Sequence, residues 1–159
     1  MTHTLILLRH AKSARPQETA DVDRPLAKRG HRDALAVGRW LRDQAPKINL
    51  VVCSPALRAV QTWDLAAAQL ETIPRVRRNK WLYGASEQDL LMAIKKLPDQ
   101  ASTALLVGHN PGLENFLTLL TGVAEPLKTS AIAIMTTSGS WERSHPGSWS
   151  LEKLATPRG

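Results

Sequence analysis

The sequence predicts an α/β protein, in which a mostly parallel sheet carries helices on both faces. Short apolar segments alternate along the chain with longer segments whose apolar residues recur every three or four positions. This is the pattern of buried strands alternating with amphipathic helices. The 159 residues are 43% hydrophobic and 22% charged, and they contain no repeat, low-complexity stretch or linker. We therefore expect a single domain over residues 1–159.

The first half of the chain supplies two strands and two helices. Residues 4–8 and 50–53 are short, continuous and apolar, as buried strands are. Between them, residues 30–44 place their apolar side chains on one helical face. The Ser-Pro pair that begins residues 54–70 resembles an N-cap followed by proline at the first helical position, so we expect a helix from there.

The second half continues the alternation. A capping box is predicted at Ser86, with Asp89 three residues later, ahead of a helix. Another helix, with four apolar residues from Leu113 to Leu120 at helical spacing, should end at Gly122. Strands are expected over residues 75–81, 103–107, 131–136 and 148–155.

Composition excludes several classes of protein. No segment reaches the roughly 18 apolar residues of a membrane helix, and none has the length of a signal-peptide core, so we expect no membrane partner. The single cysteine, Cys53, cannot form an intramolecular disulfide and is interpreted as a core residue of a cytoplasmic protein. The net charge of +7 favours an anionic partner. The basic residues are scattered, however, and the densest cluster, residues 75–80, carries no nucleic-acid motif, so no nucleic-acid partner is expected.

Four polar side chains follow three of the strands. Arg9 and His10 end the first strand, Arg58 lies shortly after the second, and His109 follows the strand at residues 103–107. Each has an ordinary explanation when taken alone: a structural histidine, a solvated arginine, a helix cap. Ligands of such sheets bind beyond the carboxyl ends of parallel strands, where all four would converge. A cluster of cations there requires an anion, and a dianion such as phosphate is suitable.

These residue types suit phosphoryl chemistry. The planar guanidinium groups of Arg9 and Arg58 can each hold two phosphoryl oxygens. The imidazole of His10 can attack phosphorus while it is neutral, and nearby guanidinium groups should lower its pKa. A backbone carbonyl would have to fix its tautomer. We expect His109 to donate a hydrogen bond to a phosphoryl oxygen.

Five sequence blocks follow one another along most of the chain. They are Arg9-His10-Ala11-Lys12-Ser13, Arg24-Pro25-Leu26 with Arg29-Gly30, residues 54–62, residues 107–111 and Thr129-Ser130-Ala131-Ile132-Ala133. Together they resemble the histidine phosphatase (phosphoglycerate mutase-like) superfamily, and the last block is similar to the SixA-type phosphohistidine phosphatases in particular. The resemblance implies a three-layer α/β/α sandwich and a phosphohistidine intermediate at His10. It also implies a phosphate pocket of Arg9, Arg58 and His109, with Ser13 as a further phosphate contact, and neither metal nor cofactor.

Two departures from the superfamily pattern bear on function. Ala11 replaces the signature glycine, which is harmless if its φ is negative and strained if φ is positive. Lys80 stands where many relatives have a glutamate general acid before a Tyr-Gly pair. Glu87 is a candidate to replace that acid, but its ordinary interpretation is a residue in the first turn of a helix, where the helix dipole favours an acidic side chain. Loss of that acid matters least when the leaving group departs easily, as an imidazole does.

The sequence therefore predicts a phosphatase that hydrolyses phosphohistidine on a protein, such as a phosphotransfer domain or a phosphocarrier. A chain of this length has little room for a lid, so we expect an open site. Two alternatives stay open: a phosphatase of small phosphorylated compounds such as acyl or nucleotide phosphates, and a phosphate-binding module without turnover.

Overall fold

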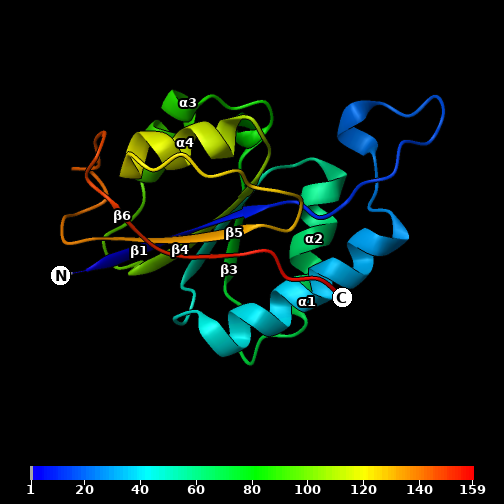
Figure 1. Ribbon diagram of the computed structural model, residues 1–159, viewed down its shortest axis with the longest axis horizontal. Coiled ribbons are helices and arrows are strands. Elements are labelled where there is room, and N and C mark those ends of the chain that lie inside the picture. The colour runs from blue at the N-terminus through cyan, green and yellow to red at the C-terminus, as the bar shows by residue number, and fades with distance from the viewer. Residues whose placement is uncertain (1) are drawn as a thin grey trace.

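The computed structural model describes residues 2–159 as a six-stranded sheet between two layers of helices (Figure 1). The strand order is β3-β2-β4-β1-β5-β6. The first four strands run parallel, and β5 and β6 add an antiparallel edge. The strands are β1 (His3–Arg9), β2 (Leu50–Cys53), β3 (Arg75–Arg78), β4 (Thr103–Gly108), β5 (Ile132–Thr137) and β6 (Ser150–Ala155). The predicted α/β/α sandwich is thus confirmed.

Two pairs of helices cover the sheet, one pair on each face (Figure 1). The first pair is α1 (Lys28–Gln44) with α2 (Leu57–Ala67), and the second is α3 (Glu87–Lys95) with α4 (Gly112–Thr121). Two short 3-10 helices, η1 (Asp21–Asp23) and η2 (Lys80–Leu82), lie in the connections. No helix in residues 2–159 is long and apolar enough to cross a membrane.

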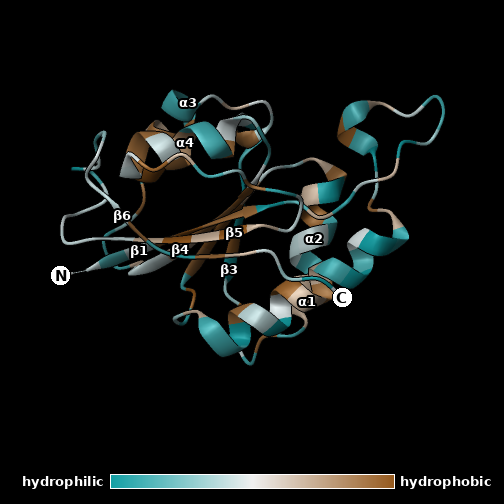
Figure 2. Ribbon diagram, viewed as in Figure 1, coloured by the Kyte–Doolittle hydropathy of each residue, from teal (hydrophilic) through white to brown (hydrophobic). Residues whose placement is uncertain are grey.

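Strand β1 shows why the sheet needs both layers. Its side chains point alternately to opposite faces. Leu5 and Leu7 are buried in the core beneath α3 and α4, whereas Ile6 and Leu8 belong to the core beneath α1 and α2. The hydropathy colouring accordingly shows hydrophobic strands in the centre and polar outer helix surfaces (Figure 2). Cys53 is buried in the second core, as predicted, and burial raises the pKa of its thiol to about 12.

Several predicted helix ends are confirmed. The side chain of Ser86 accepts a hydrogen bond from the Asp89 backbone, and the Asp89 carboxylate accepts one from the Ser86 amide, which completes the capping box. Gly122 ends α4 in the left-handed region with φ of 75°.

The predicted start of the helix after β2 is wrong. The helix begins at Leu57 rather than at Pro55, and its N-cap residue makes no side-chain hydrogen bond. The hydroxyl of Ser54 instead accepts a hydrogen bond from the Ala56 backbone, in a turn that precedes the helix. The strand expected over residues 75–81 is also shorter, because the Asn79 side chain accepts from the Trp81 amide and starts η2.

The topology places three strand ends side by side. β4 lies between β2 and β1, and all three are parallel, so their carboxyl ends meet at one edge of the sheet. The segments that follow them begin at His10, Ser54 and His109. This edge is where a ligand site is expected in such a fold.

Candidate active site

The backbone of His10, which follows β1, is held by the last residue of β4 and by the connection that precedes β5. Its amide donates to the Gly108 carbonyl at 3.2 Å, and its carbonyl accepts from the Ser130 amide at 3.1 Å. Its ring nitrogen Nδ1 lies 2.8 Å from the Ala11 carbonyl. Because a carbonyl can only accept, Nδ1 carries the proton of the neutral ring and Nε2 keeps a free lone pair. The side chain is buried, with the residue only 7% exposed.

The two arginines approach from different elements. Arg9, the last residue of β1, donates from Nη1 to the Leu127 carbonyl at 2.9 Å. Arg58, the second residue of α2, is only 6% exposed and is therefore not a solvated helix residue. It donates from Nη1 to the Asp21 carbonyl at 2.7 Å and from Nη2 to the Asp21 carboxylate at 3.1 Å.

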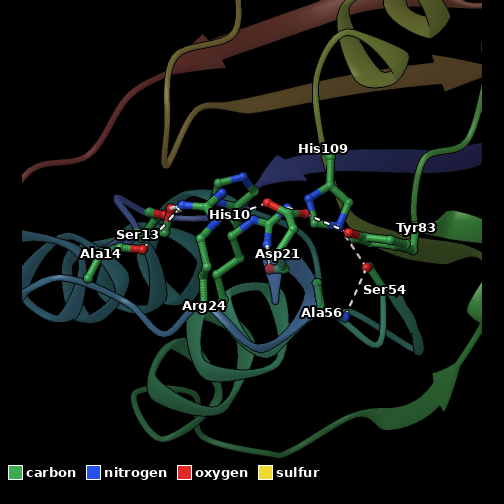
Figure 3. Close-up of polar contacts among 11 residues, drawn as sticks. His10, Ser13, Ala14, Asp21, Arg24, Ser54, Ala56, Tyr83 and His109 are labelled. Atoms are coloured by element: carbon green, nitrogen blue, oxygen red, sulfur yellow. Dashed lines mark hydrogen bonds and ion pairs between the residues drawn. The ribbon is translucent and has the colours of Figure 1, made fainter. Parts of the chain in front are cut away.

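His109 lies beside His10, with ring centroids 5.2 Å apart. Its Nε2 is 2.7 Å from the hydroxyl of Ser54, and the ring of Tyr83 meets it edge-on at 5.7 Å (Figure 3). The structure thus brings together His10, Arg9, Arg58 and His109, as the sequence predicts.

Burial and charge keep both histidines neutral. Burial, with the nearby His109, Arg58 and Arg9, lowers the pKa of His10 to about 3, against the opposing effect of the Ala11 carbonyl. Burial, with Arg58 as the largest charge contribution, lowers the pKa of His109 to about 4. Burial also lowers the pKa of Arg9. At neutral pH the cluster therefore combines two neutral imidazoles with two guanidinium cations.

Three of these four side chains hold a buried nitrogen without a partner. The atoms are Nε of Arg9, Nε of Arg58 and Nδ1 of His109. Buried polar groups are nearly always hydrogen-bonded, so each exception needs an explanation. Within residues 2–159 only two other side-chain atoms, on Trp63 and Ser130, share this condition. The two guanidinium N–H groups, and His109 Nδ1 when it carries the ring proton, are free to donate to an anionic acceptor.

Sequence reasoning missed the segment that covers Arg58. Asp21, in η1, accepts from Arg58, from Arg24 Nε at 3.0 Å and from the Tyr83 hydroxyl at 2.5 Å (Figure 3). These hydrogen bonds, that of Tyr83 first, hold the pKa of the Asp21 carboxyl well below its usual range, and the carboxylate raises the pKa of Tyr83. Arg24 also donates to the hydroxyl of Ser13 at 2.8 Å, so Ser13, the further phosphate contact expected from the sequence, already has a hydrogen-bond partner. The expectation of an open site did not include this coverage of Arg58 by Asp21.

No sequence signal pointed to Asp21. Arg24 and Tyr83 lie in noticed motifs, but the Asp21–Tyr83 contact joins residues 62 positions apart. Because η1 has no apolar periodicity and no buried residue, it gave no pattern from which its position could be inferred.

The Ala11 substitution is accommodated without strain. Among residues 2–159, the only non-glycine residues with positive φ are Glu18 and Ser130, so Ala11 keeps an ordinary backbone conformation. Ala11 is fully buried, and its amide donates to the hydroxyl of Thr62 at 2.9 Å. The harmless interpretation of this departure is confirmed.

The structure provides no obvious general acid at the position noted in the sequence. Lys80 lies in η2, where its ammonium group is 5.2 Å from the ring centroid of Trp81. Glu87 is the first residue of α3, as in its ordinary helical interpretation. In the described part of the chain, neither side chain hydrogen-bonds or pairs with a residue of the site. Residues 2–159 also contain no group of three His, Cys, Asp or Glu residues placed to hold a metal ion.

Comparisons with known proteins agree with this fold. The family model of the histidine phosphatase superfamily (branch 1) matches residues 5–82. An uncharacterised protein of Mycobacterium tuberculosis is 38% identical over 162 residues, which cover 95% of this chain and 100% of that protein. A structure assigned as the phosphohistidine phosphatase SixA of Nakamurella multipartitia matches with a TM-score of 0.83 and 30% identity, over 99% of this chain and 97% of the other.

A further structure, of the protein histidine phosphatase SixA complexed with tungstate, matches with a TM-score of 0.84 over 97% of both chains. At 23% identity that likeness concerns the fold. The identities, the coverage and the family model together assign the chain: it belongs to the histidine phosphatase superfamily and is of the SixA type.

Proposed function

We propose that this phosphatase hydrolyses phosphohistidine on a protein substrate through a covalent phosphohistidine intermediate at His10. One observation carries the proposal: a neutral, buried His10, whose Nδ1 hydrogen-bonds the Ala11 carbonyl, lies in a cluster that holds three unpartnered buried nitrogens. A phosphoryl group bound there would satisfy those donors and meet a nucleophile at the same time. SixA itself is known as a complex with tungstate, an oxyanion with the shape and charge of phosphate.

The first step is a transfer to His10. The Nε2 lone pair attacks phosphorus, a P–N bond forms on Nε2, and the P–N bond to the substrate imidazole breaks. The hydrogen bond from Nδ1 to the Ala11 carbonyl directs Nε2 at the phosphoryl group and stabilises the positive charge that the ring acquires. With a pKa of about 3 in the free enzyme, His10 is ready to attack throughout the neutral range.

Arg9, Arg58 and His109 act on the phosphoryl oxygens. The guanidinium groups offset the negative charge of the three equatorial oxygens as the bond order changes. Ser54 Oγ already accepts a hydrogen bond from the Ala56 amide, and its hydroxyl hydrogen can be donated to His109 Nε2. The proton of neutral His109 then belongs on Nδ1, the atom without a partner, which donates to a phosphoryl oxygen.

The leaving group explains why Lys80 is tolerated. When the other ring nitrogen of the substrate phosphohistidine carries a proton, its imidazole departs as a neutral molecule and needs no proton from the enzyme. An alkoxide leaving group does need one, and general acid catalysis is worth about 10²–10⁴-fold. Lys80, a cation lying against Trp81, does not provide such an acid.

The second step regenerates the enzyme. Water attacks phosphorus, the P–N bond breaks, and its electron pair returns to Nε2 of His10. The two water protons remain with the phosphate product and the solvent, so inorganic phosphate leaves and His10 is again neutral. Because phosphorylated His10 with a proton on Nδ1 is an imidazolium, it is a good leaving group in this step as well.

The experiment that tests the substrate class compares three phosphoryl donors: a histidine-phosphorylated protein, acetyl phosphate and glycerol phosphate. We expect kcat/KM to be highest for the phosphoprotein. We expect kcat/KM for glycerol phosphate to be at least about 10²-fold lower than kcat/KM for the phosphoprotein or for acetyl phosphate. Faster turnover of acetyl phosphate than of any phosphoprotein would favour a phosphatase of small activated phosphates. Equal rates on glycerol phosphate would refute the inference from Lys80.

A further inference from the structure

A groove of about 760 Å³ lies between β3, η2 and α3. Its walls combine cationic and apolar side chains, which the proposed mechanism does not use. The residues that carry the argument are Arg77, Arg78, Lys80, Trp81, Met92 and Lys96, which we call the β3–α3 groove. Strand β3 is the edge strand of the sheet, and all four of its residues are exposed.

The groove is strongly cationic. It contains four cations and a single carboxylate, that of Asp89. Asp89 is already engaged, because its carboxylate closes the capping box at the start of α3. In residues 2–159 none of the four cations forms an ion pair. A concave surface lined by charges of one sign attracts a ligand of the opposite sign and raises its rate of association.

The groove also exposes two large apolar side chains. Trp81 is 72% exposed and Met92 is 54% exposed. Tryptophan and arginine are among the residues most enriched at energetic hot spots of protein interfaces. The groove is therefore suited to a peptide segment that carries both acidic and apolar side chains.

The groove adjoins the site along the chain at two segments. Pro55 lines it and follows Ser54, whose hydroxyl contacts His109. Trp81 lies two residues before Tyr83, whose ring meets His109 and whose hydroxyl bonds to Asp21. Two chain segments, Ser54-Pro55 and Trp81 to Tyr83, therefore contribute both to the groove and to the surroundings of His109.

We propose that the β3–α3 groove docks the acidic chain segment that flanks the phosphohistidine of the protein substrate. This proposal rests on the proposed function and adds a surface that recognises the protein substrate. The charges steer the acidic substrate, Trp81 anchors its apolar side chains, and the phosphohistidine enters beside His109. A small phosphorylated compound does not reach the groove.

The test uses two synthetic phosphohistidine peptides of the same length, one flanked by glutamate and the other by glutamine. At low ionic strength we expect kcat/KM of the wild type to be roughly tenfold higher for the glutamate peptide. The difference should shrink when salt shortens the Debye length to about 5 Å or less. The double variant Arg77→Glu with Lys96→Glu should lose this preference through a higher KM, while turnover of acetyl phosphate stays within about twofold of the wild type.

A matched control carries the same change in net charge elsewhere. Arg39→Glu with Lys47→Glu alters two exposed residues, in α1 and in the connection that follows it. This control should keep the preference for the glutamate peptide. In addition, Trp81→Ala should raise KM for both peptides roughly tenfold and leave acetyl phosphate turnover unchanged.

The outcomes separate the two proposals. If the wild type hydrolyses both peptides equally well, the docking proposal is refuted while the proposed function stands. If it hydrolyses neither peptide but does hydrolyse acetyl phosphate, the proposed function fails and the docking proposal fails with it. If a labelled oligouridine binds the groove more tightly than the glutamate peptide, and the groove variant abolishes that binding, the surface recognises nucleic acid and the proposal is overturned.

Discussion

Replacing His10 by glutamine is expected to make folding less sensitive to acid. The buried ring has a pKa of about 3 in the folded protein, against about 6.5 for an unfolded histidine. As the pH falls below 6.5 the unfolded chain binds a proton at this residue and the folded chain does not. Protonation therefore favours unfolding, and stability is lost from about pH 6.5 until the pH reaches the folded pKa.

The linkage gives the size of the effect. Between pH 7 and pH 4.5, a shift from 6.5 to about 3 lowers the free energy of unfolding by about 2.5 kcal/mol. Glutamine does not titrate and so removes this contribution. Every other titrating group, His109 included, stays in both proteins and largely cancels in the comparison.

Urea unfolding at the two pH values, followed by the fluorescence of the five tryptophans, measures the difference. We expect the loss of stability from pH 7 to pH 4.5 to be about 2.5 kcal/mol smaller in His10→Gln than in the wild type. The exposed His31, changed to glutamine, serves as the control and should retain the wild-type loss. Equal losses in His10→Gln and the wild type would refute the claim that His10 is buried and neutral in the folded protein.

Three further predictions concern the support of the site. Thr62→Val leaves the buried Ala11 amide without an acceptor, so unfolding should become easier by about 1–3 kcal/mol in chemical denaturation. Gly30→Ala would drive a Cβ into the backbone carbonyl of Lys12, two residues after the proposed nucleophile, and should lower thermal stability by about 2–3 kcal/mol and reduce kcat. Asp21→Asn removes the negative charge that pairs with Arg58, a proposed phosphate-binding residue. The inhibition constants of tungstate and phosphate should therefore fall roughly three- to tenfold.

Each variant has a matched control. Thr118→Val changes an exposed hydroxyl that only donates to the carbonyl four residues earlier in α4, and Gly139→Ala adds a Cβ with no close backbone neighbour. Both should be nearly neutral. Asp43→Asn breaks an exposed ion pair in α1 and should leave inhibition unchanged. If the two stability controls lose as much stability as Thr62→Val and Gly30→Ala, the supporting roles of Thr62 and Gly30 are contradicted. If tungstate or phosphate inhibits Asp21→Asn more weakly than the wild type, the role of Asp21 is contradicted.

The convergence of the site could be predicted because it follows from topology. Parallel strands of one sheet end at one edge, so residues such as His10 and His109 meet whatever the details of their loops. The burial of Arg58 could not be predicted, since the side chain of an arginine in a helix can either be exposed to solvent or be buried in an ion pair. Its burial depends on Asp21, which is supplied by a connection with no hydrophobic period.

The helix start after β2 shows a different limit. Ser54-Pro55 has the composition of an N-cap, and local sequence preference alone favours that interpretation. Tertiary contacts decide otherwise, because the Ser54 hydroxyl is positioned beside His109 and the helix begins three residues after Ser54, at Leu57. The capping box at Ser86, which is exposed and depends on local contacts alone, formed as predicted.

The most direct test of the mechanism is to trap the phosphorylated enzyme. Wild-type protein and His10→Ala are mixed with a radiolabelled histidine-phosphorylated protein, quenched rapidly in alkaline detergent and separated, and the labelled peptide is identified by mass spectrometry. We expect an acid-labile, alkali-stable label on His10 of the wild type and none on the variant. Absence of label from the wild type, a label on another residue, or undiminished turnover by His10→Ala would contradict a phosphohistidine intermediate at His10.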